Sequence, residues 1–285
     1  MLTIHPKDIP TARLHGYLLS AVAPRPIALA STIDEEGNPN LSPFSFFNVF
    51  SANPPILIFS PARRVRDNTT KHTLENAQVT GEVVINVVNH AIVQQTSLSS
   101  TEYGKGVNEF DKAGFTMLSS EKIKPFRVKE SPVQFECKIL EIKALGNQGG
   151  AGNLIICEVV CMHIDEAVLD ENGRIDQLKL DLVARAGGSF YSRANTSFFE
   201  IPKPIQQKGI GIDLLPLTIR SSQILTGNDL GQLGNVELLP EASDVNKFMQ
   251  DNPQFMTSEI NEKHKFAQEF LSKNDVESAW KVLLS

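Results

Sequence analysis

The most constraining feature of this 285-residue chain is a paired strand signal over residues 131–165. Residues 131–145 are long and partly alternating in polarity, and residues 154–165 form a second apolar run. The segment between them, residues 146–153, is rich in glycine and typical of a turn. The pattern predicts a long antiparallel hairpin, and so an antiparallel sheet as the basis of the fold.

Other strand signals dominate the first two hundred residues. Apolar or β-branched runs occur at 25–34, 40–51, 55–60 and 82–89. Helical signals are shorter, at 69–78, 90–100 and 108–114, the last with Asn108 as its cap and Gly114 as its stop. Many strands joined by hairpin turns, with scattered short helices, predict a mainly β fold of the barrel type rather than a doubly wound sheet.

The tail of the chain has a different pattern. Residues 199–220 read as extended and are interrupted by proline, whereas 241–250 and 257–284 carry apolar residues at helical spacing. We therefore predict one domain over residues 1–200 and a partly helical extension over residues 201–285. Because the extension holds large apolar side chains that need burial, we expect it to cover the barrel or the mouth of its site; the alternative is a module that docks a partner protein.

Composition excludes several classes of protein. The net charge is −6 and the basic residues form no stripe, which argues against a nucleic-acid partner. No secretory signal opens the chain, and no apolar run approaches the roughly 20 residues that span a membrane. The three cysteines, Cys137, Cys157 and Cys161, show no metal or disulfide spacing. We expect a cytoplasmic protein with reduced, buried thiols.

Common catalytic motifs are missing from the sequence. No phosphate-binding P-loop, dinucleotide fingerprint, GxSxG nucleophile motif or HExxH zinc motif is present. His163 and Asp165 share one face of a predicted strand, but two ligands without a third are weak evidence for a metal. We predict no metal site.

The stretch 40–55 mixes aromatic side chains with hydroxyl and amide side chains. A flat heterocycle with a phosphate tail needs such an apolar wall with polar edges, together with cations and donors for the phosphate. The basic and hydroxyl residues near the next strand supply them: Ser60, Arg63, Arg64, Arg66, Thr69, Thr70, Lys71 and Thr73. The alternative is a phenylalanine-rich core strand followed by a solvated basic loop, and periodicity alone favours that alternative.

Longer motifs resemble a known family. The segment APRPIALASTIDEEGNPNLSPFSFFNVFSANPPILIFSP is similar to the opening of the flavin reductase-like family, the FMN-binding split barrels. The likeness continues in TKHTLENAQVTGEVVINVV, GVNEFDKAGFT, ESPVQFECK and ARAGGSFYSR, and covers about residues 15–195. One position departs from the pattern, since His72 stands where the family has aspartate.

The resemblance implies a split β-barrel and a set of FMN-binding residues. The wall for the flavin ring and ribityl chain would come largely from the backbone of Asn40, Leu41, Ser42, Pro43, Phe44, Ser45, Phe46 and Asn48. Ser31 and Thr32 would meet the ribityl chain or phosphate, and Ser60, Lys71 and Thr73 the phosphate. Arg185, Gly188 and Tyr191 would close the site or that of a dimer neighbour.

The resemblance also implies an activity. We expect hydride transfer from NADH or NADPH to N5 of FMN, in a homodimer that passes electrons to a monooxygenase or another acceptor. The flavin carries the chemistry, so no catalytic side chain is required, although His163 is a candidate proton donor or nicotinamide contact. The alternative is a non-catalytic FMN electron carrier, similar to flavoredoxin, that a protein partner reduces.

Overall fold

The computed structural model describes residues 1–202, 208–257 and 259–285. They form two compact units, Met1–Phe198 and Phe199–Ser285, which we call unit 1 and unit 2. The predicted boundary between residues 200 and 201 remains a prediction, because a domain is defined by independent folding rather than by compactness. In the described part of the chain, no helix combines the length and the apolarity that crossing a membrane requires.

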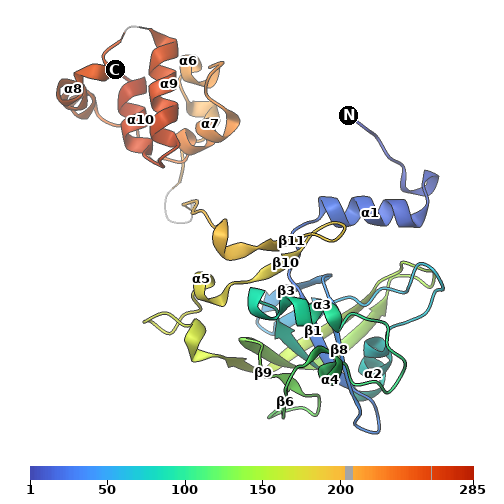
Figure 1. Cartoon of the computed structure of the whole chain (residues 1–285). Helices are drawn as coiled ribbons and strands as arrows, with labels where there is room; N and C mark the ends of the chain where they lie inside the picture. Colours follow the sequence, from blue (N-terminus) through green and yellow to red (C-terminus); the bar gives the residue numbers. More distant parts are fainter. Residues whose placement is uncertain (203–207, 258) are drawn as a thin grey trace. The chain divides into compact units, whose positions relative to one another are not determined.

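Unit 1 is built on a seven-stranded antiparallel sheet in the order β2-β1-β5-β8-β9-β4-β3 (Figure 1). Its strands are β1 Ala28–Ile33, β2 Pro39–Phe44, β3 Phe47–Ala52, β4 Pro55–Phe59, β5 Glu82–Val87, β8 Val133–Ala144 and β9 Asn153–Ile164. Two small ladders pair β6 Met117–Leu118 with β7 Arg127–Val128, and β10 Val183–Arg185 with β11 Tyr191–Arg193. The predicted hairpin over 131–165 is confirmed as the pair of β8 and β9.

The two edge strands of this sheet, β2 and β3, are consecutive in the chain. Only Ser45 and Phe46 separate the end of β2 from the start of β3, a link that spans at most about 11 Å. The sheet must therefore curl until the end of β2 lies close to the start of β3. Among the described residues no ladder joins β2 to β3. The two edges of the barrel are therefore joined by the covalent link between β2 and β3 but not by backbone hydrogen bonds. This arrangement confirms the predicted split-barrel fold class.

The inner face of the barrel is the main apolar core. Phe44 and Phe59 pack with ring centroids 5.4 Å apart, beside buried residues of β1, β5, β8 and β9. Helix α2, His72–Thr80, adds Leu74 and Ala77 to the same cluster. Each fully buried aromatic side chain contributes about 1.5–3 kcal/mol, so this cluster fixes the position of α2 against the barrel.

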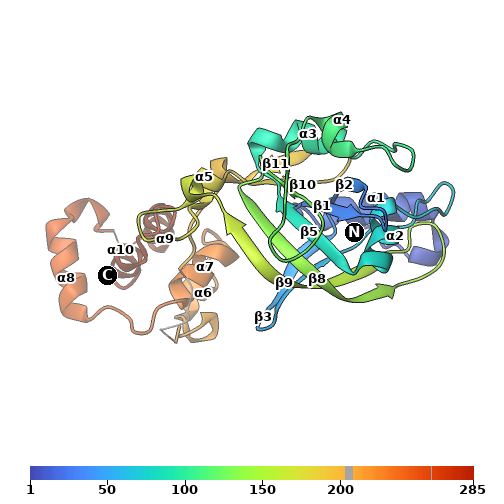
Figure 2. The ribbon, with the colours of Figure 1, turned by 90° about the horizontal axis from the view of Figure 1, so that it is seen from below.

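A second cluster covers the opposite face of β1. Leu29 and Leu41 pack there on Phe110, a fully buried residue of α4, Glu109–Ala113. The short helix α3, Val93–Leu98, contacts both α4 and β2, and Figure 2 shows α3 and α4 side by side. The remaining α-helices of unit 1 are α1 Thr11–Ala21 and α5 Gln177–Leu180. The packing of α4 on β2 places the first residue of α4, Glu109, beside the edge strand.

Several predicted elements differ from the structure. The segment 40–51 is two strands, because the chain bends at Ser45 and Phe46. Asn108 does cap α4, accepting the backbone N–H of Phe110 at 3.0 Å, and Gly114 follows it in the left-handed conformation. Helix α1 was not predicted. Its sequence carries no strong apolar stripe, which is why no helix was predicted there, and none of its residues is buried.

Unit 2 is helical, as predicted for the C-terminal extension. Its helices are α6 Leu217–Arg220, α7 Gly227–Gly234, α8 Ala242–Asp251, α9 Ile260–Leu271 and α10 Val276–Leu283. The single helix predicted over 257–284 is wrong, since Asn274 lies at a φ of 59° and ends the run between α9 and α10. The extended segment predicted over 199–220 contains α6, and positions 203–207 and 258 lie outside the described residues.

Unit 2 has its own apolar core around the only tryptophan of the sequence. Trp280 is 1% exposed, and its Nε1–H donates to the carbonyl oxygen of Leu233 at 3.1 Å. The side chain thus joins α10 to α7 through both packing and a hydrogen bond. Its truncation leaves a cavity and an unpaired buried carbonyl.

We expect Trp280→Ala to lower the free energy of unfolding of unit 2 by about 3–5 kcal/mol. Urea unfolding followed by far-ultraviolet circular dichroism measures the change. The matched control is Glu277→Ala on the same helix, whose exposed ion pair with Lys281 contributes at most about 0.5 kcal/mol. Equal stability of the two variants would contradict this account of the core.

Candidate functional site

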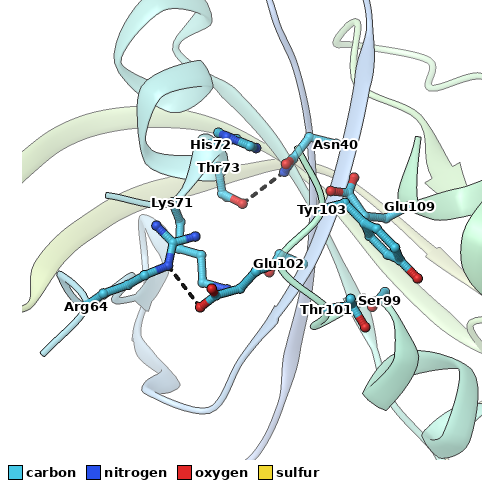
Figure 3. Close-up of a pocket in the computed structure, with 11 residues that line it drawn as sticks. Asn40, Arg64, Lys71, His72, Thr73, Ser99, Thr101, Glu102, Tyr103 and Glu109 are labelled. Carbon is cyan, nitrogen blue, oxygen red and sulfur yellow. Dashed lines mark hydrogen bonds and ion pairs between the residues drawn. The ribbon is translucent and has the colours of Figure 1, made fainter. Parts of the chain in front are cut away.

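A small polar pocket lies along the free edge of β2 (Figure 3). Three parts of unit 1 meet there: β2, the N-terminal end of α2 with the loop before it, and the segment between α3 and α4. The lining residues are Asn40, Ser42, Arg64, Lys71, His72, Thr73, Ser99, Thr101, Glu102, Tyr103 and Glu109. Two cations, two carboxylates and several hydroxyls make this a site for a polar, charged group.

Arg64 is held firmly at one side of the pocket. Its Nε lies 3.0 Å from Oε1 of Glu102, and its Nη1 donates to Oγ1 of Thr69 at 2.7 Å and to the carbonyl oxygen of Thr70 at 2.6 Å. The turn of the β8–β9 hairpin supports this loop, since the N–H of Gly150 donates to the Arg63 carbonyl. The charge of Arg64 is therefore already paired within the chain.

Lys71, the N-cap residue of α2, is the second cation. The described residues provide no ion pair or hydrogen bond for its ammonium group. Burial, and then the nearby charge of Arg64, lower the pKa of Lys71 from its ordinary value. A partly buried cation without a partner is costly, and an anion bound in the pocket would relieve that cost.

A buried network fixes the floor of the pocket. Nδ2 of Asn40 donates to Oγ1 of Thr73 at 2.9 Å and to Oγ1 of Thr32 at 3.3 Å. Asn76 also donates to Thr32, at 3.2 Å. These bonds join β1, β2 and α2, so Thr32 orients Asn40 and Thr73 but does not itself line the pocket. Ser31 points to the other face of β1, fully buried, with no hydrogen-bond partner for its hydroxyl among the described residues.

Glu109 is the buried carboxylate of the pocket, at 5% exposure. Its Oε2 accepts the backbone N–H of Leu41 at 3.0 Å, on the free edge of β2. Burial, the largest cause, raises the pKa of Glu109, although the Leu41 N–H and the charges of His72 and Lys71 act in the opposite direction. The Leu41 amide is therefore already used within the chain.

The second half of the 40–48 segment lies away from the pocket lining. Pro43 follows on β2, Phe44 is in the barrel core, and Phe46 is half-exposed near His15. Asn48 is on β3, where its side chain accepts the N–H of its own neighbour. Ser60 is buried beside Gly152 of the hairpin turn, 2.7 Å from where a Cβ on that glycine would lie.

Ser45 belongs to a separate cluster around Arg25. The buried guanidinium of Arg25 donates to the carbonyls of Leu19 and Val22 and approaches Oγ of Ser45 at 3.4 Å. The backbone of Arg25 also pairs with that of Arg185. The three predicted closing residues lie in this second cluster: Arg185 stacks over the ring of Tyr191 at 4.6 Å, and Gly188, at a φ of 58°, forms the turn between them.

His163 does not line the pocket. Its Nε2 lies 2.7 Å from Oε1 of Glu136, a fully buried carboxylate. Burial opposes ionisation of Glu136, but the N–H groups of Glu121 and Lys122 and the His163 ring together lower its pKa. Asp165 instead caps the short helix that follows, through the N–H of Ala167. His163 and Asp165, which strand alternation alone would place on one face, thus have different partners.

The structure thus brings together Asn40, Ser42, Lys71 and Thr73 of the predicted set and adds residues that the sequence reasoning did not select. Glu102 and Tyr103 come from the segment between α3 and α4, and Glu109 is the first residue of α4. Glu109 follows the helix cap Asn108, and an acidic residue there is ordinary helix chemistry. No signal in the sequence distinguished it as a pocket residue.

Comparison with known proteins identifies relatives of unit 1. The model of the flavin reductase like domain matches residues 20–179. An uncharacterised protein of Aquifex aeolicus is 36% identical over 181 residues, which cover 64% of this chain and 90% of that protein. The family match lies wholly within unit 1.

Two solved structures resemble the chain. Nitrilotriacetate monooxygenase component B from Bacillus cereus has a TM-score of 0.66 and 29% identity, over 70% of this chain and 98% of that one. A Shewanella frigidimarina protein, assigned as a flavin reductase with a split barrel domain, has a TM-score of 0.60 and 29% identity, over 70% and 96%.

The raised pKa of Glu109 predicts a pH dependence of stability. A carboxyl whose pKa is higher in the folded state stabilises the fold most below its ordinary value of 4.5, and that contribution is lost as the pH rises through the raised value. Since glutamine does not titrate, we expect the melting temperature of the wild type to fall relative to that of Glu109→Gln between about pH 4 and pH 7.

Thermal melts of flavin-free protein at several pH values measure this difference. Asp111→Asn, an exposed carboxylate on the same helix, is the control. A pH-independent difference between the wild type and Glu109→Gln would refute the burial argument.

Proposed function

The chain belongs to the flavin reductase-like family, and we propose that it binds FMN at the β2 edge and catalyses NAD(P)H-dependent flavin reduction. The observation that carries the proposal is Lys71, a partly buried cation without a partner in the described chain, beside Thr73 at the start of α2. A dianionic phosphate is the group that such a place would hold.

The residues present fit a flavin phosphate on one side of the pocket. The carboxylate of Glu102 already pairs with Arg64 and would repel a phosphate there. We place the phosphate at Lys71 and Thr73, where the first N–H groups of α2 lack intrahelical partners. Asn40, fixed by Thr32 and Thr73, would then present its amide to the ribityl chain.

The remaining predicted residues would shape and hold the part of the site that receives the flavin ring. Ser42 lines the pocket, and the backbone of β2 beyond it, Pro43 and Phe44, is the proposed edge along which the ring lies. The cluster of Arg25 with Ser45 holds the bend at the end of that strand. FMN, when bound, accepts a hydride from the nicotinamide, and the chain supplies orientation and electrostatics.

The electron acceptor and the assembly are further parts of the proposal. An oxygenase is the acceptor that we favour, since the Bacillus cereus relative at 29% identity is a component of a monooxygenase. A homodimer is the assembly that we favour, because the resemblance to the flavin reductase-like family implies one. We assign the flavin chemistry to residues 1–200 and a separate helical extension to 201–285.

The reductase activity can be tested by anaerobic absorbance. We expect NADH or NADPH to bleach the flavin band of the FMN-loaded protein faster than it bleaches free FMN. The faster nucleotide identifies the donor. An unchanged spectrum with FMN demonstrably bound would overturn the reductase proposal and favour an electron carrier that a protein partner reduces.

The phosphate site can be tested by substitution of Lys71. We expect Lys71→Ala to weaken FMN binding by about 1.5–3 kcal/mol, roughly ten- to a hundredfold, because a charge-assisted contact is lost. Riboflavin, which has no phosphate, should bind the variant and the wild type almost equally. Quenching of flavin fluorescence measures both affinities.

The control for lost charge is Arg66→Ala. Arg66 is exposed, pairs with Asp67 and Glu102, and does not line the pocket. If Lys71→Ala weakened FMN and riboflavin equally, or no more than Arg66→Ala weakened FMN, Lys71 would not be the phosphate contact.

A further inference from the structure

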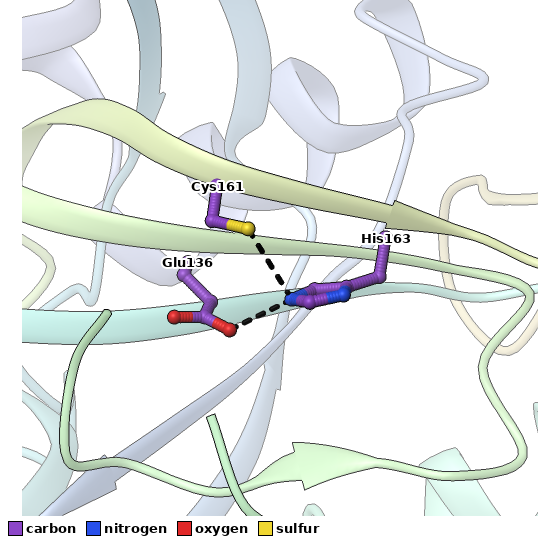
Figure 4. A group of neighbouring side chains, drawn as sticks. All are labelled: Glu136, Cys161 and His163. Atoms are coloured by element: carbon purple, nitrogen blue, oxygen red, sulfur yellow. Dashed lines mark hydrogen bonds and ion pairs between the residues drawn. The ribbon is translucent and has the colours of Figure 1, made fainter. Parts of the chain in front are cut away.

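Three potential metal ligands converge on the β8–β9 ladder, apart from the pocket lining (Figure 4). Glu136 of β8 lies opposite Cys161 of β9, and Gln134 opposite His163. The register shifts at this point of the ladder, after Glu136. Because alternate residues of a strand share a face, the side chains of Cys161 and His163 meet that of Glu136. The three donor atoms all lie within 4.8 Å of one another.

The geometry differs from that of a catalytic triad. A thiol–imidazole–carboxylate relay uses both ring nitrogens, one for each neighbour. Here Sγ of Cys161 lies 3.5 Å from Nε2 of His163, and Oε1 of Glu136 lies 2.7 Å from the same Nε2. Three donors that point to one place are suited to a shared ion rather than to proton relay.

The distances are close to those of a tetrahedral metal site. Ligands at about 2.3 Å for sulfur and about 2.0–2.1 Å for nitrogen lie roughly 3.5 Å apart around zinc, which is the separation of Sγ and Nε2. Oε1 and Nε2 share a hydrogen bond in the present structure. They would need to separate by roughly 0.6 Å when an ion replaces the shared proton.

The surroundings hold the ligands in place and leave access. The carboxylate of Glu136 accepts the N–H groups of Glu121 at 2.8 Å and Lys122 at 2.7 Å, as outer partners of a ligand commonly do. Cys161 is partly exposed, and the His163 side chain is 19% exposed. Nε of Arg127 lies 3.9 Å from Oε1 of Glu136, and its positive charge opposes the binding of a cation. Binding therefore requires an ion that favours the Cys161 thiolate, because the thiolate adds a negative charge to the cluster.

We propose that Glu136, Cys161 and His163 bind a thiophilic divalent metal ion, with Zn²⁺ as the best match and a water molecule as the fourth ligand. Starting from the Glu136 carboxylate and a neutral His163 ring, binding releases the Cys161 thiol proton to solvent, while the ring proton leaves Nε2 and is held on Nδ1, so one proton is released per ion. The proposal departs from the sequence-based prediction of no metal site, which weighed only His163 and Asp165 and did not bring Glu136 and Cys161 together.

Cobalt(II) provides an optical probe of this site in the full-length protein. We expect one equivalent of Co²⁺ to produce a thiolate-to-cobalt charge-transfer band in difference spectra against the metal-free protein, and Zn²⁺ to abolish it. Cys161→Ser should remove the band. His163→Gln should weaken Co²⁺ binding by at least about tenfold. Wild-type protein, but not Cys161→Ser, should melt at a higher temperature with Zn²⁺ present.

Two variants serve as matched controls. Asp165→Asn and His90→Gln alter a carboxylate and a histidine outside the cluster and should bind Co²⁺ as the wild type does. Cys161 is chosen over Glu136 because Glu136 is fully buried and its loss risks unfolding. The absence of a charge-transfer band at tenfold excess of Co²⁺ in folded wild-type protein, or an unchanged band in Cys161→Ser, would overturn the proposal.

Discussion

The free edge of β2 is the constraint on which the candidate site depends. Among the described residues the strand pairs only with β1, so the backbone groups on its other side need partners from outside the sheet. Glu109 satisfies one of them, the N–H of Leu41. The chain then leaves β2 at Ser45 and begins β3 at the opposite edge of the sheet. An opening with polar walls follows directly from a barrel that closes through its chain rather than through a ladder.

The charges around this opening are unequally satisfied. Arg64 has Glu102, Thr69 and Thr70 as partners, whereas Lys71 has none among the described residues. The burial that lowers the pKa of Lys71 also raises that of Glu109, since both groups lose solvation. A bound anion at Lys71 would favour the charged lysine and oppose ionisation of Glu109 further. Glu102 and Glu109 attract Lys71 only through space, and in our proposal a bound phosphate supplies the direct partner that the lysine lacks among the described residues.

Much of the fold could be predicted from the sequence because the β8–β9 hairpin and the other strands carry strong local patterns. The break between β2 and β3 could not, since the apolar pattern continues through Ser45 and Phe46 while only the three-dimensional path bends. Of the site, Lys71 and Thr73 were predicted by resemblance. Glu102 and Glu109 were missed because their segment reaches β2 through long-range contacts, the packing of Phe110 and the hydrogen bond from Leu41 to Glu109, which no local pattern encodes.

The cluster around His163 also depends on long-range contacts that the sequence pattern does not predict. Strand alternation predicts which residues share a face of β9, but not which segment covers that face or what faces it from β8. The cover is the stretch around Glu121 and Lys122, which has little periodicity and whose backbone N–H groups solvate Glu136. A fully buried carboxylate costs several kcal/mol unless such partners surround it. The N–H groups together with His163 make Glu136 tolerable as an ionised residue, and the same arrangement preorganises its oxygen beside a thiol and an imidazole. The same packing therefore stabilises the buried charge of Glu136 and, in our proposal, presents three ligands to one ion.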